Sequence, residues 1–168
     1  MNRLIITTEA LRNYKQISKS VTKAILEQYI RDAQIQDLAP LLGERLFNDI
    51  VLNPDKHVDL LNGGEYDING ITYYNVGLNA VLVHYSYSRY LLFGNMVDTP
   101  YSMVEKLNPG NSQPISYKQK EALHKENQDT AFTYFGSVRK YLERTKYPMY
   151  EINKCESRQS KFRIYKVV

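Results

Sequence analysis

The sequence has few of the features that mark secreted, membrane-spanning or nucleotide-binding proteins. It contains a single cysteine, Cys155, which cannot form an internal disulfide and so excludes the disulfide-stapled class of small secreted domains. No run approaches the ~18 consecutive apolar residues that a membrane helix needs. The apolar stretch within residues 1–13 is too short for a signal peptide. We therefore expect a soluble protein made in a cytoplasm, with no membrane partner.

Patterns that bind phosphates or metals are also missing. Neither GxGxxG nor GxxxxGK[ST] occurs, so the sequence gives almost no support for nucleotide binding. The three histidines, His57, His84 and His124, have no i, i+3 or i, i+4 spacing, and HExxH is absent. His84 is most simply a hydrogen-bonded core histidine, and Cys155 a free, inert thiol. No cofactor, metal or catalytic residue is expected, although a hydrolase that uses unrecognised carboxylates stays an alternative.

The positive charge of the chain is confined to its last residues. The formal net charge is +4, and residues 154–168 carry five basic residues against one acidic residue. Residues 1–153 are therefore neutral overall. An electrostatic partner would be met by this tail and not by a basic face of the body.

The composition otherwise fits one compact domain of 168 residues with 43% hydrophobic residues. Tyrosine is unusually frequent, with fifteen residues, and tryptophan is absent. Tyrosine rings bury area while keeping a hydroxyl for hydrogen bonding. They therefore suit half-buried surfaces, including contacts between subunits.

Apolar periodicity and capping signals predict five helices. Thr8 caps the first helix, Pro40 begins a new one, Gly43 marks a bend or close contact within it, and Ser116 with Gln119 forms a capping box. The fourth helix is apolar nearly all round, which predicts a central buried helix. The predicted ranges are residues 8–14, 20–33 (with an apolar stripe of Val21, Ile25, Tyr29 and Ala33 beside Leu26 and Ile30), 40–52, 78–97 and 116–146.

Two connecting segments carry their own signals. Asn69-Gly70 lies between β-forming residues and predicts a tight hairpin near residues 66–73. Residues 98–114 contain three prolines and a glycine, which predicts a long irregular loop with a functional role or high mobility. The expected fold is mainly α: a bundle of four to five helices with this small β-hairpin and an extended C-terminal strand or tail.

The tail differs from the rest of the chain. Residues 161–164 alternate strictly between basic and apolar side chains, and β-branched or aromatic residues continue to residue 168. This pattern predicts a strand, which needs an existing edge to join. The chain thus divides into a helical domain, residues 1–150, and a basic extended docking tail, residues 151–168. A solvated disordered end and a nucleic-acid contact are the alternatives.

Several short motifs resemble the small head-to-tail adaptor (connector) proteins of tailed bacteriophages, and those of crAss-like phages most of all. The resemblance covers residues 5–150. The residues that carry it are Tyr29-Ile30-Arg31-Asp32-Ala33-Gln34, Asp37-Leu38-Ala39-Pro40-Leu41-Leu42-Gly43, Leu46-Phe47, Gly70, Thr72-Tyr73, Gly77-Leu78, Thr99-Pro100-Tyr101, Tyr141-Leu142 and Tyr147-Pro148.

This resemblance implies a non-enzymatic structural protein of the virion. Such a protein assembles with itself into a ring of about twelve copies beneath the portal protein. The ring joins the capsid to further neck or tail proteins and lets DNA pass through its channel. The implied location is the head-to-tail neck of the particle, and the host cytoplasm during assembly.

The residues that would contact partners follow from this reading together with the tail pattern. We expect the tail to add as a strand to a portal subunit or a neighbouring ring protein. The loop at residues 98–114 would supply a second contact. The candidate tail residues are Lys161, Phe162, Arg163, Ile164, Tyr165, Lys166, Val167 and Val168, and the candidate loop residues are Thr99, Tyr101, Met103 and Lys106. The alternative function is a DNA-binding accessory protein that uses the basic tail.

Overall fold

The computed structural model describes residues 3–94, 96–98, 103–105 and 115–151. The protein is mainly helical and carries a small antiparallel hairpin, so the coarse fold prediction is confirmed. The predicted C-terminal strand lies outside the described residues. The elements are α1 (Thr8–Tyr14), α2 (Lys23–Ala33), a π-helix (Gln34–Leu38), α3 (Ala39–Leu42), α4 (Glu44–Leu52), a 3₁₀-helix (Pro54–His57), α5 (Val58–Asn62), β1 (Gly64–Ile68), β2 (Ile71–Asn75), α6 (Leu78–Phe93), β3 (Met96–Asp98), β4 (Met103–Glu105) and α7 (Tyr117–Arg144).

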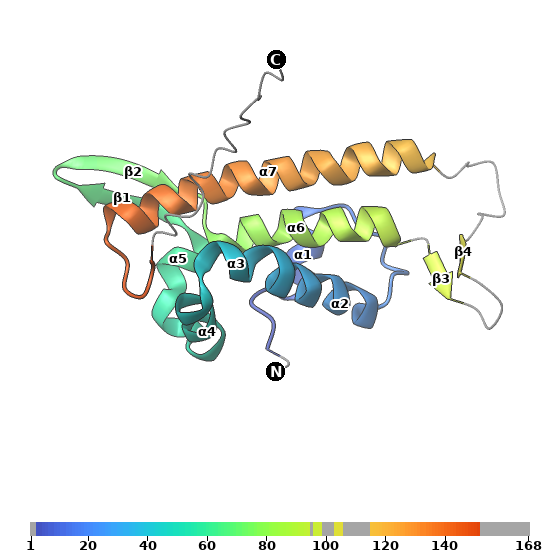
Figure 1. The fold of residues 1–168 in the computed structure, drawn as a ribbon, viewed down its shortest axis with the longest axis horizontal. Coiled ribbons are helices and arrows are strands. Elements are labelled where there is room, and N and C mark those ends of the chain that lie inside the picture. The colour runs from blue at the N-terminus through green and yellow to red at the C-terminus, as the bar shows by residue number, and fades with distance from the viewer. Residues whose placement is uncertain (1–2, 95, 99–102, 106–114, 152–168) are drawn as a thin grey trace, which may run out of the picture.

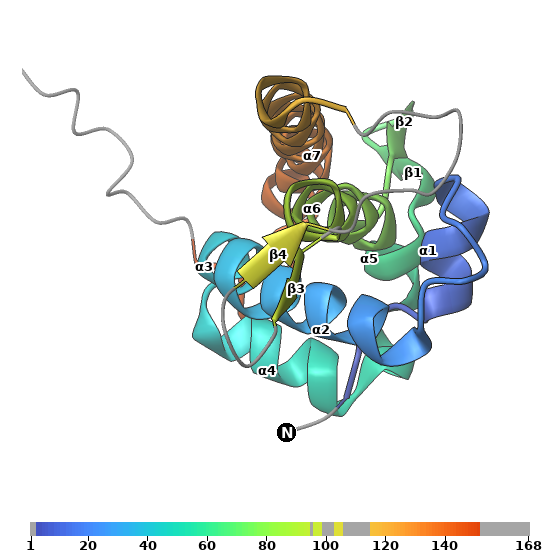
Figure 2. The same ribbon diagram turned by 90° about the vertical axis from the view of Figure 1, so that its right-hand side faces the viewer.

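Helix α6 is the centre of the structure, as its apolar sequence predicts. The long helix α7 lies along one side of α6, and α2 packs on the other side (Figures 1 and 2). Leu78 and Leu82 are fully buried. Ser86 is also fully buried, and its hydroxyl donates to the Leu82 carbonyl at 2.7 Å, which satisfies a polar group in the core. The helix ends at Phe93 and not at residue 97, because Met96–Asp98 pair as a strand.

The predicted helix start at Pro40 is wrong. The chain continues from α2 through the π-helix into α3 without leaving helical geometry, and the Ala39 N–H donates to the Gln34 carbonyl. A π-turn widens the helix, which leaves room for the Pro40 ring and absorbs its missing N–H. The helical run ends at Gly43, where φ is +79°, so the predicted bend at this glycine is confirmed.

The beginnings of α1 and α2 also differ from the prediction. Thr7, not Thr8, caps α1, and its side chain accepts from the Ala10 N–H at 3.1 Å. Thr8 is buried inside the first turn instead. Helix α2 begins at Lys23, after a turn closed by a hydrogen bond from the Val21 N–H to the Ser18 carbonyl.

The buried side of α2 takes Leu26 and Ile30 from one of the two predicted apolar rows and only Ala33 from the other. Its buried residues are Leu26, Ile30 and Ala33, whereas Ile25 is 42% exposed. Both rows have helical spacing, so the sequence alone does not decide which row faces α6.

The first hairpin confirms its prediction in register and turn. Tyr66 lies opposite Tyr73 and Ile68 opposite Ile71. Asn69 and Gly70 have φ of 53° and 77°, as a two-residue type I′ turn requires. The hairpin extends beyond the end of the helical body (Figure 1).

The prediction that residues 98–114 are irregular is wrong for part of the segment. Met103–Glu105 pair with Met96–Asp98, and Val97 lies opposite Val104. The prolines of the segment fall outside these two short strands, so they remove no hydrogen-bond donor from the ladder. Among the described residues, no helix has the length and apolar character to cross a membrane.

Candidate functional site

Most of the predicted contact residues fall outside the part of the chain that the structure describes. These are the tail residues 161–168 and, in the loop, Thr99, Tyr101 and Lys106. Met103 lies in β4, opposite Asp98 of β3. The contacts expected of these residues therefore stay predictions.

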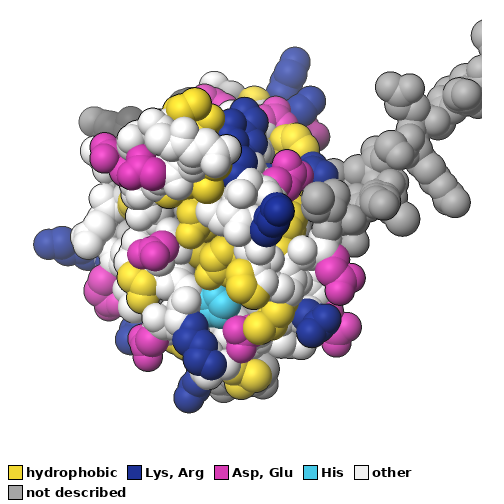
Figure 3. Space-filling model, turned by 90° about the vertical axis from the view of Figure 1, so that its left-hand side faces the viewer, with side chains coloured by type: hydrophobic (Ala, Val, Ile, Leu, Met, Phe, Trp, Pro, Cys, Tyr) yellow, Lys and Arg dark blue, Asp and Glu magenta, His cyan; other side chains and the backbone are white. Residues whose placement is uncertain are grey.

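The described residues form an aromatic cluster at one end of the molecule. We call this end the hairpin end: it comprises β1, β2, the 3₁₀-helix, α5, the last turns of α7 and residues 145–151. Apolar side chains gather on it between acidic and basic ones (Figure 3). Five rings follow one another across it, with centroid distances of 5.6 Å for Tyr73–Tyr66, 4.8 Å for Tyr66–Tyr141, 5.9 Å for Tyr141–Tyr147 and 5.9 Å for Tyr147–His57.

His57 joins three segments at the buried end of this row. Its Nε2 lies 2.8 Å from the Asp49 carboxylate of α4, and its Nδ1 lies 2.8 Å from the Tyr147 hydroxyl. Asn53 donates to the other oxygen of Asp49 at 2.8 Å. His57 is only 6% exposed and lies in the 3₁₀-helix Pro54–His57. We call Asp49, His57 and Tyr147 the histidine junction.

The electrostatics of the histidine junction keep Asp49 charged and Tyr147 protonated. Hydrogen bonds from Asn53 and His57 lower the pKa of Asp49, so this carboxylate stays charged and is a poor proton donor. Burial, followed by the nearby Tyr141 hydroxyl and the Asp59 and Asp49 carboxylates, raises the pKa of Tyr147 to about 12. A tyrosine with a raised pKa is less ionised at neutral pH and so supplies less of the nucleophilic phenolate.

The junction borders a cavity of about 410 Å³ that holds two carboxylates. It is lined by Asp49, Lys56, His57, Asp59, Tyr141, Tyr147, Pro148 and Met149. A hydrolase with paired carboxylates usually raises the pKa of one of them so that it acts as the acid. Asp49, whose pKa is lowered, fits the charged member of such a pair and not the acid.

Helix α7 anchors the hairpin through one arginine and one serine. The Arg144 guanidinium lies 3.9 Å from the centre of the Tyr73 ring and donates to the Tyr66 hydroxyl at 3.2 Å. The Ser137 hydroxyl donates to the Tyr74 carbonyl at 3.5 Å. An isolated two-stranded hairpin is marginal in water, so these contacts hold β1 and β2 against the body.

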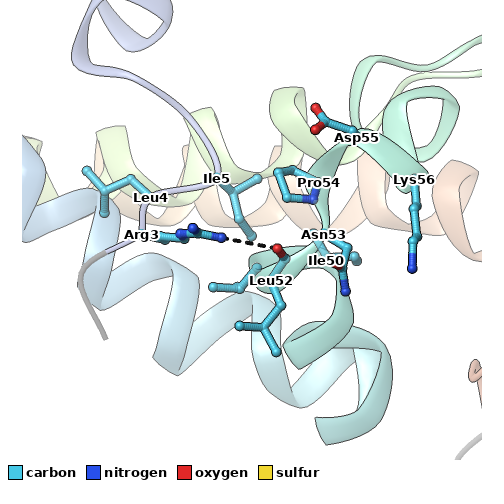
Figure 4. Close-up of a pocket in the computed structure, with 10 residues that line it drawn as sticks. Arg3, Leu4, Ile5, Ile50, Leu52, Asn53, Pro54, Asp55 and Lys56 are labelled. Atoms are coloured by element: carbon cyan, nitrogen blue, oxygen red, sulfur yellow. Dashed lines mark hydrogen bonds between the residues drawn. The ribbon is translucent and has the colours of Figure 1, made fainter.

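A second cavity, of about 500 Å³, lies between the N-terminal segment and the end of α4 (Figure 4). Arg3 donates to the Leu52 carbonyl at 3.1 Å and so satisfies an unpaired group at the helix end. The side chains of Asp55 and Lys56 point away from Arg3. The charged groups do not converge, so we assign the cavity no chemistry.

The other two histidines also serve the packing of α6 and α7. His84 is 8% exposed, and its Nδ1 lies 3.2 Å from the Asn127 side-chain oxygen, which confirms the prediction of a hydrogen-bonded core histidine. Burial, and then the charge of Lys15, lowers the pKa of His84. His124 lies 3.0 Å from the Ser88 carbonyl. In the described part of the chain, no group of three or more histidine, cysteine or acidic residues could hold a metal ion.

One family of known sequences matches this chain. The family of unknown function DUF6712 matches residues 38–160. The matched range includes the hairpin end, the histidine junction, α6 and α7, and begins at the last residue of the π-helix. No curated protein and no solved structure matches the chain. Because the match covers more than half of the sequence, the chain belongs to the DUF6712 family.

Proposed function

We propose that the protein is a head-to-tail connector subunit of a tailed bacteriophage. Copies of the chain form a ring beneath the portal, joining the capsid to the tail, and DNA passes through the channel of the ring. The portal protein and further neck or tail proteins are its partners. The helical bundle, residues 1–150, is the ring-forming body, and residues 151–168 are the docking tail.

The observation that carries this proposal is where the residues of the resemblance lie in the fold. Gly43, Gly70 and Gly77 have φ of 79°, 77° and 84°, and each lies at a junction between elements. A Cβ on Gly77 would lie 2.6 Å from the Gly63 nitrogen, so only glycine fits there. Tyr147 bonds His57 in the histidine junction. Residues that carry the resemblance thus lie where the backbone path depends on them, and this supports a resemblance in fold.

The exposed apolar side chains support assembly with further copies. Helix α2 and the π-helix expose Ile25 and Ile35, the latter by 54%, on one side of α6. Helix α7, on the other side of α6, exposes Leu123 and, by 61%, Phe132 (Figure 2). In a ring, each copy presents one surface to a different surface of the next copy. Exposed apolar side chains on two different sides of α6 are compatible with this requirement.

Interrupting the gene in a phage that encodes this chain tests the proposal. An early stop codon should yield DNA-filled heads and separate tails, because the joint between them is missing. Electron microscopy of the lysate counts joined and unjoined particles, and the chain supplied from a plasmid should restore joining. Joined, infectious particles without the chain would refute the proposal.

Purified protein tests the alternative of a DNA-binding accessory protein. Binding through the basic tail would weaken with salt, with a log–log slope near −0.9 for each phosphate neutralised. A titration of duplex DNA at two salt concentrations measures this slope. Strong, salt-dependent binding together with normal head–tail joining in the stop-codon mutant would favour the alternative.

A further inference from the structure

The outer edge of β1 is open. In an antiparallel hairpin, hydrogen-bonded and non-hydrogen-bonded residue pairs alternate along the two strands. With a two-residue turn, the pair beside the turn is hydrogen-bonded, and here that pair is Ile68 and Ile71. The N–H and C=O groups of Glu65 and Asp67 therefore point away from β2. No backbone hydrogen bond joins them to another segment among the described residues. On the other edge of the hairpin, the Tyr74 carbonyl already accepts from Ser137.

This open edge has two chemically different faces. Glu65 and Asp67 are exposed on one face. Tyr66 and Ile68 alternate with them and lie on the other face, where Tyr66 packs edge-on against Tyr141. A strand that paired with β1 would thus find carboxylates on one side and apolar groups on the other.

The tail of the chain carries the complementary alternation. Lys161 and Arg163 alternate with Phe162 and Ile164. If the basic side chains lie beside the carboxylates of β1, the period of two places the aromatic and β-branched side chains beside Tyr66 and Ile68. A slip of one residue would place charges against the apolar face, so the pattern specifies the register.

We propose that residues 161–164 of one copy add as a third strand to β1 of a neighbouring copy. Opposite charges and paired apolar side chains on adjacent strands each stabilise the pairing. Residues 152–160 can span up to about 30 Å between the body and this strand. The tail and β1 are different surfaces, so the contact repeats from copy to copy and can close a ring. The strand pairing itself does not depend on the proposed function; only its place in a closed ring rests on it.

The test is a charge exchange in the full-length chain. One variant carries Glu65→Lys and Asp67→Lys, and the other carries Lys161→Glu and Arg163→Glu. A dye on Cys155, the single cysteine, reports association by fluorescence anisotropy, and sedimentation velocity gives the size of the complexes. The matched control is Glu9→Lys with Glu44→Lys, two exposed carboxylates of α1 and α4.

Each of the two variants alone should associate at least tenfold more weakly than the unaltered chain, and the control should associate as the unaltered chain does. An equimolar mixture of the two should recover to within about threefold, because each tail then meets an oppositely charged edge on the other chain. The inference is refuted if the reversals leave association unchanged, if the mixture shows no recovery, or if the unaltered chain does not associate. If the unaltered chain does not associate in solution but head–tail joining still depends on it, this inference is refuted and the proposed function stays intact.

Discussion

The middle of the molecule and its hairpin end differ in how much they depend on directional contacts. In the middle, α6 buries apolar side chains between α2 and α7, and Leu78, Val81 and Leu82 have no exposed area. At the hairpin end, Leu60 and Leu142 are also fully buried, but directional contacts are added: His57 lies between a carboxylate and a hydroxyl, and a guanidinium lies over a ring. Burial of apolar area is additive and non-directional, whereas each of the latter contacts depends on one geometry.

This difference has a consequence for function. Loss of one directional contact can loosen the hairpin end while the core stays folded. The end that presents the open edge of β1 is therefore the part that can adapt to a neighbour. The middle serves as the rigid support on which that end is carried.

The largest effect is expected in the middle. Leu82→Ala removes a fully buried side chain of α6 and leaves a cavity, which should cost about 2–5 kcal/mol of unfolding free energy. Urea denaturation measures it. The matched control is Leu52→Ala, the same change at a side chain that is 49% exposed, with an expected cost below about 1 kcal/mol. Equal costs would contradict the assignment of α6 as the core.

A smaller effect is expected at the histidine junction. Tyr147→Phe removes the hydroxyl that lies 2.8 Å from His57 Nδ1 and leaves a buried ring nitrogen without that partner. The expected loss of unfolding free energy is about 1–3 kcal/mol. Tyr74→Phe is the control, because Tyr74 is 67% exposed. If both variants unfold at the same urea concentration, the junction does not stabilise this end.

Local signals in the sequence predict much of the middle and the first hairpin. The apolar sequence at residues 78–93, the capping box of Ser116 and Gln119, and the Asn69-Gly70 turn each act within a few residues of themselves. Such signals depend on backbone geometry that neighbours along the chain impose. These elements can therefore be predicted without information on tertiary contacts.

The histidine junction could not be predicted from the sequence. Tyr147 and His57 are 90 positions apart, and Asp49 and His57 are separated by the helix end at Asn53 and Pro54. No periodicity connects residues on different elements. The spacing of the histidines, which argued only against a metal site, carried no information about these partners.

The start of α3 was missed for a related reason. A proline is compatible with the first turn of a new helix and also with a widened turn inside a continuing one. In this chain the widened turn begins at Gln34, whose buried side chain accepts from the Ile5 N–H and donates to the Arg3 carbonyl. That contact is tertiary and leaves no local pattern.

We expect His84, in the middle of the molecule, to make the stability depend on pH between pH 5 and 7.5. Because the pKa of His84 is lowered from 6.5, the unfolded chain takes up a proton below about pH 6.5 that the folded protein does not bind. Stability should therefore rise with pH across this range and be lost as the pH falls from 6.5 toward the lowered value. Urea midpoints measured from pH 5 to 7.5 report the slope.

Two variants isolate this contribution. His84→Gln keeps an amide near Asn127 and cannot titrate, so its slope between pH 5 and 7.5 should be flatter. Lys15→Gln removes the second cause of the shift and should flatten the slope less, because burial is the first cause. The slope is the readout, since either change also alters packing against Tyr134 or Tyr87. An unchanged slope in His84→Gln would assign the pH dependence elsewhere.

The smallest effect is expected where α7 holds the hairpin. Arg144→Gln removes the guanidinium over Tyr73, a contact that contributes about 0.5–1 kcal/mol at such sites. Amide hydrogen exchange in β2 should then accelerate by about two- to fivefold while exchange in α6 stays unchanged. The control is Arg45→Gln, whose ion pair with Glu151 spans 3.7 Å between side chains more than 70% exposed and contributes little. Faster exchange throughout α6 would show that the two regions unfold as one unit, which would contradict the claim that the hairpin end can loosen while the core stays folded.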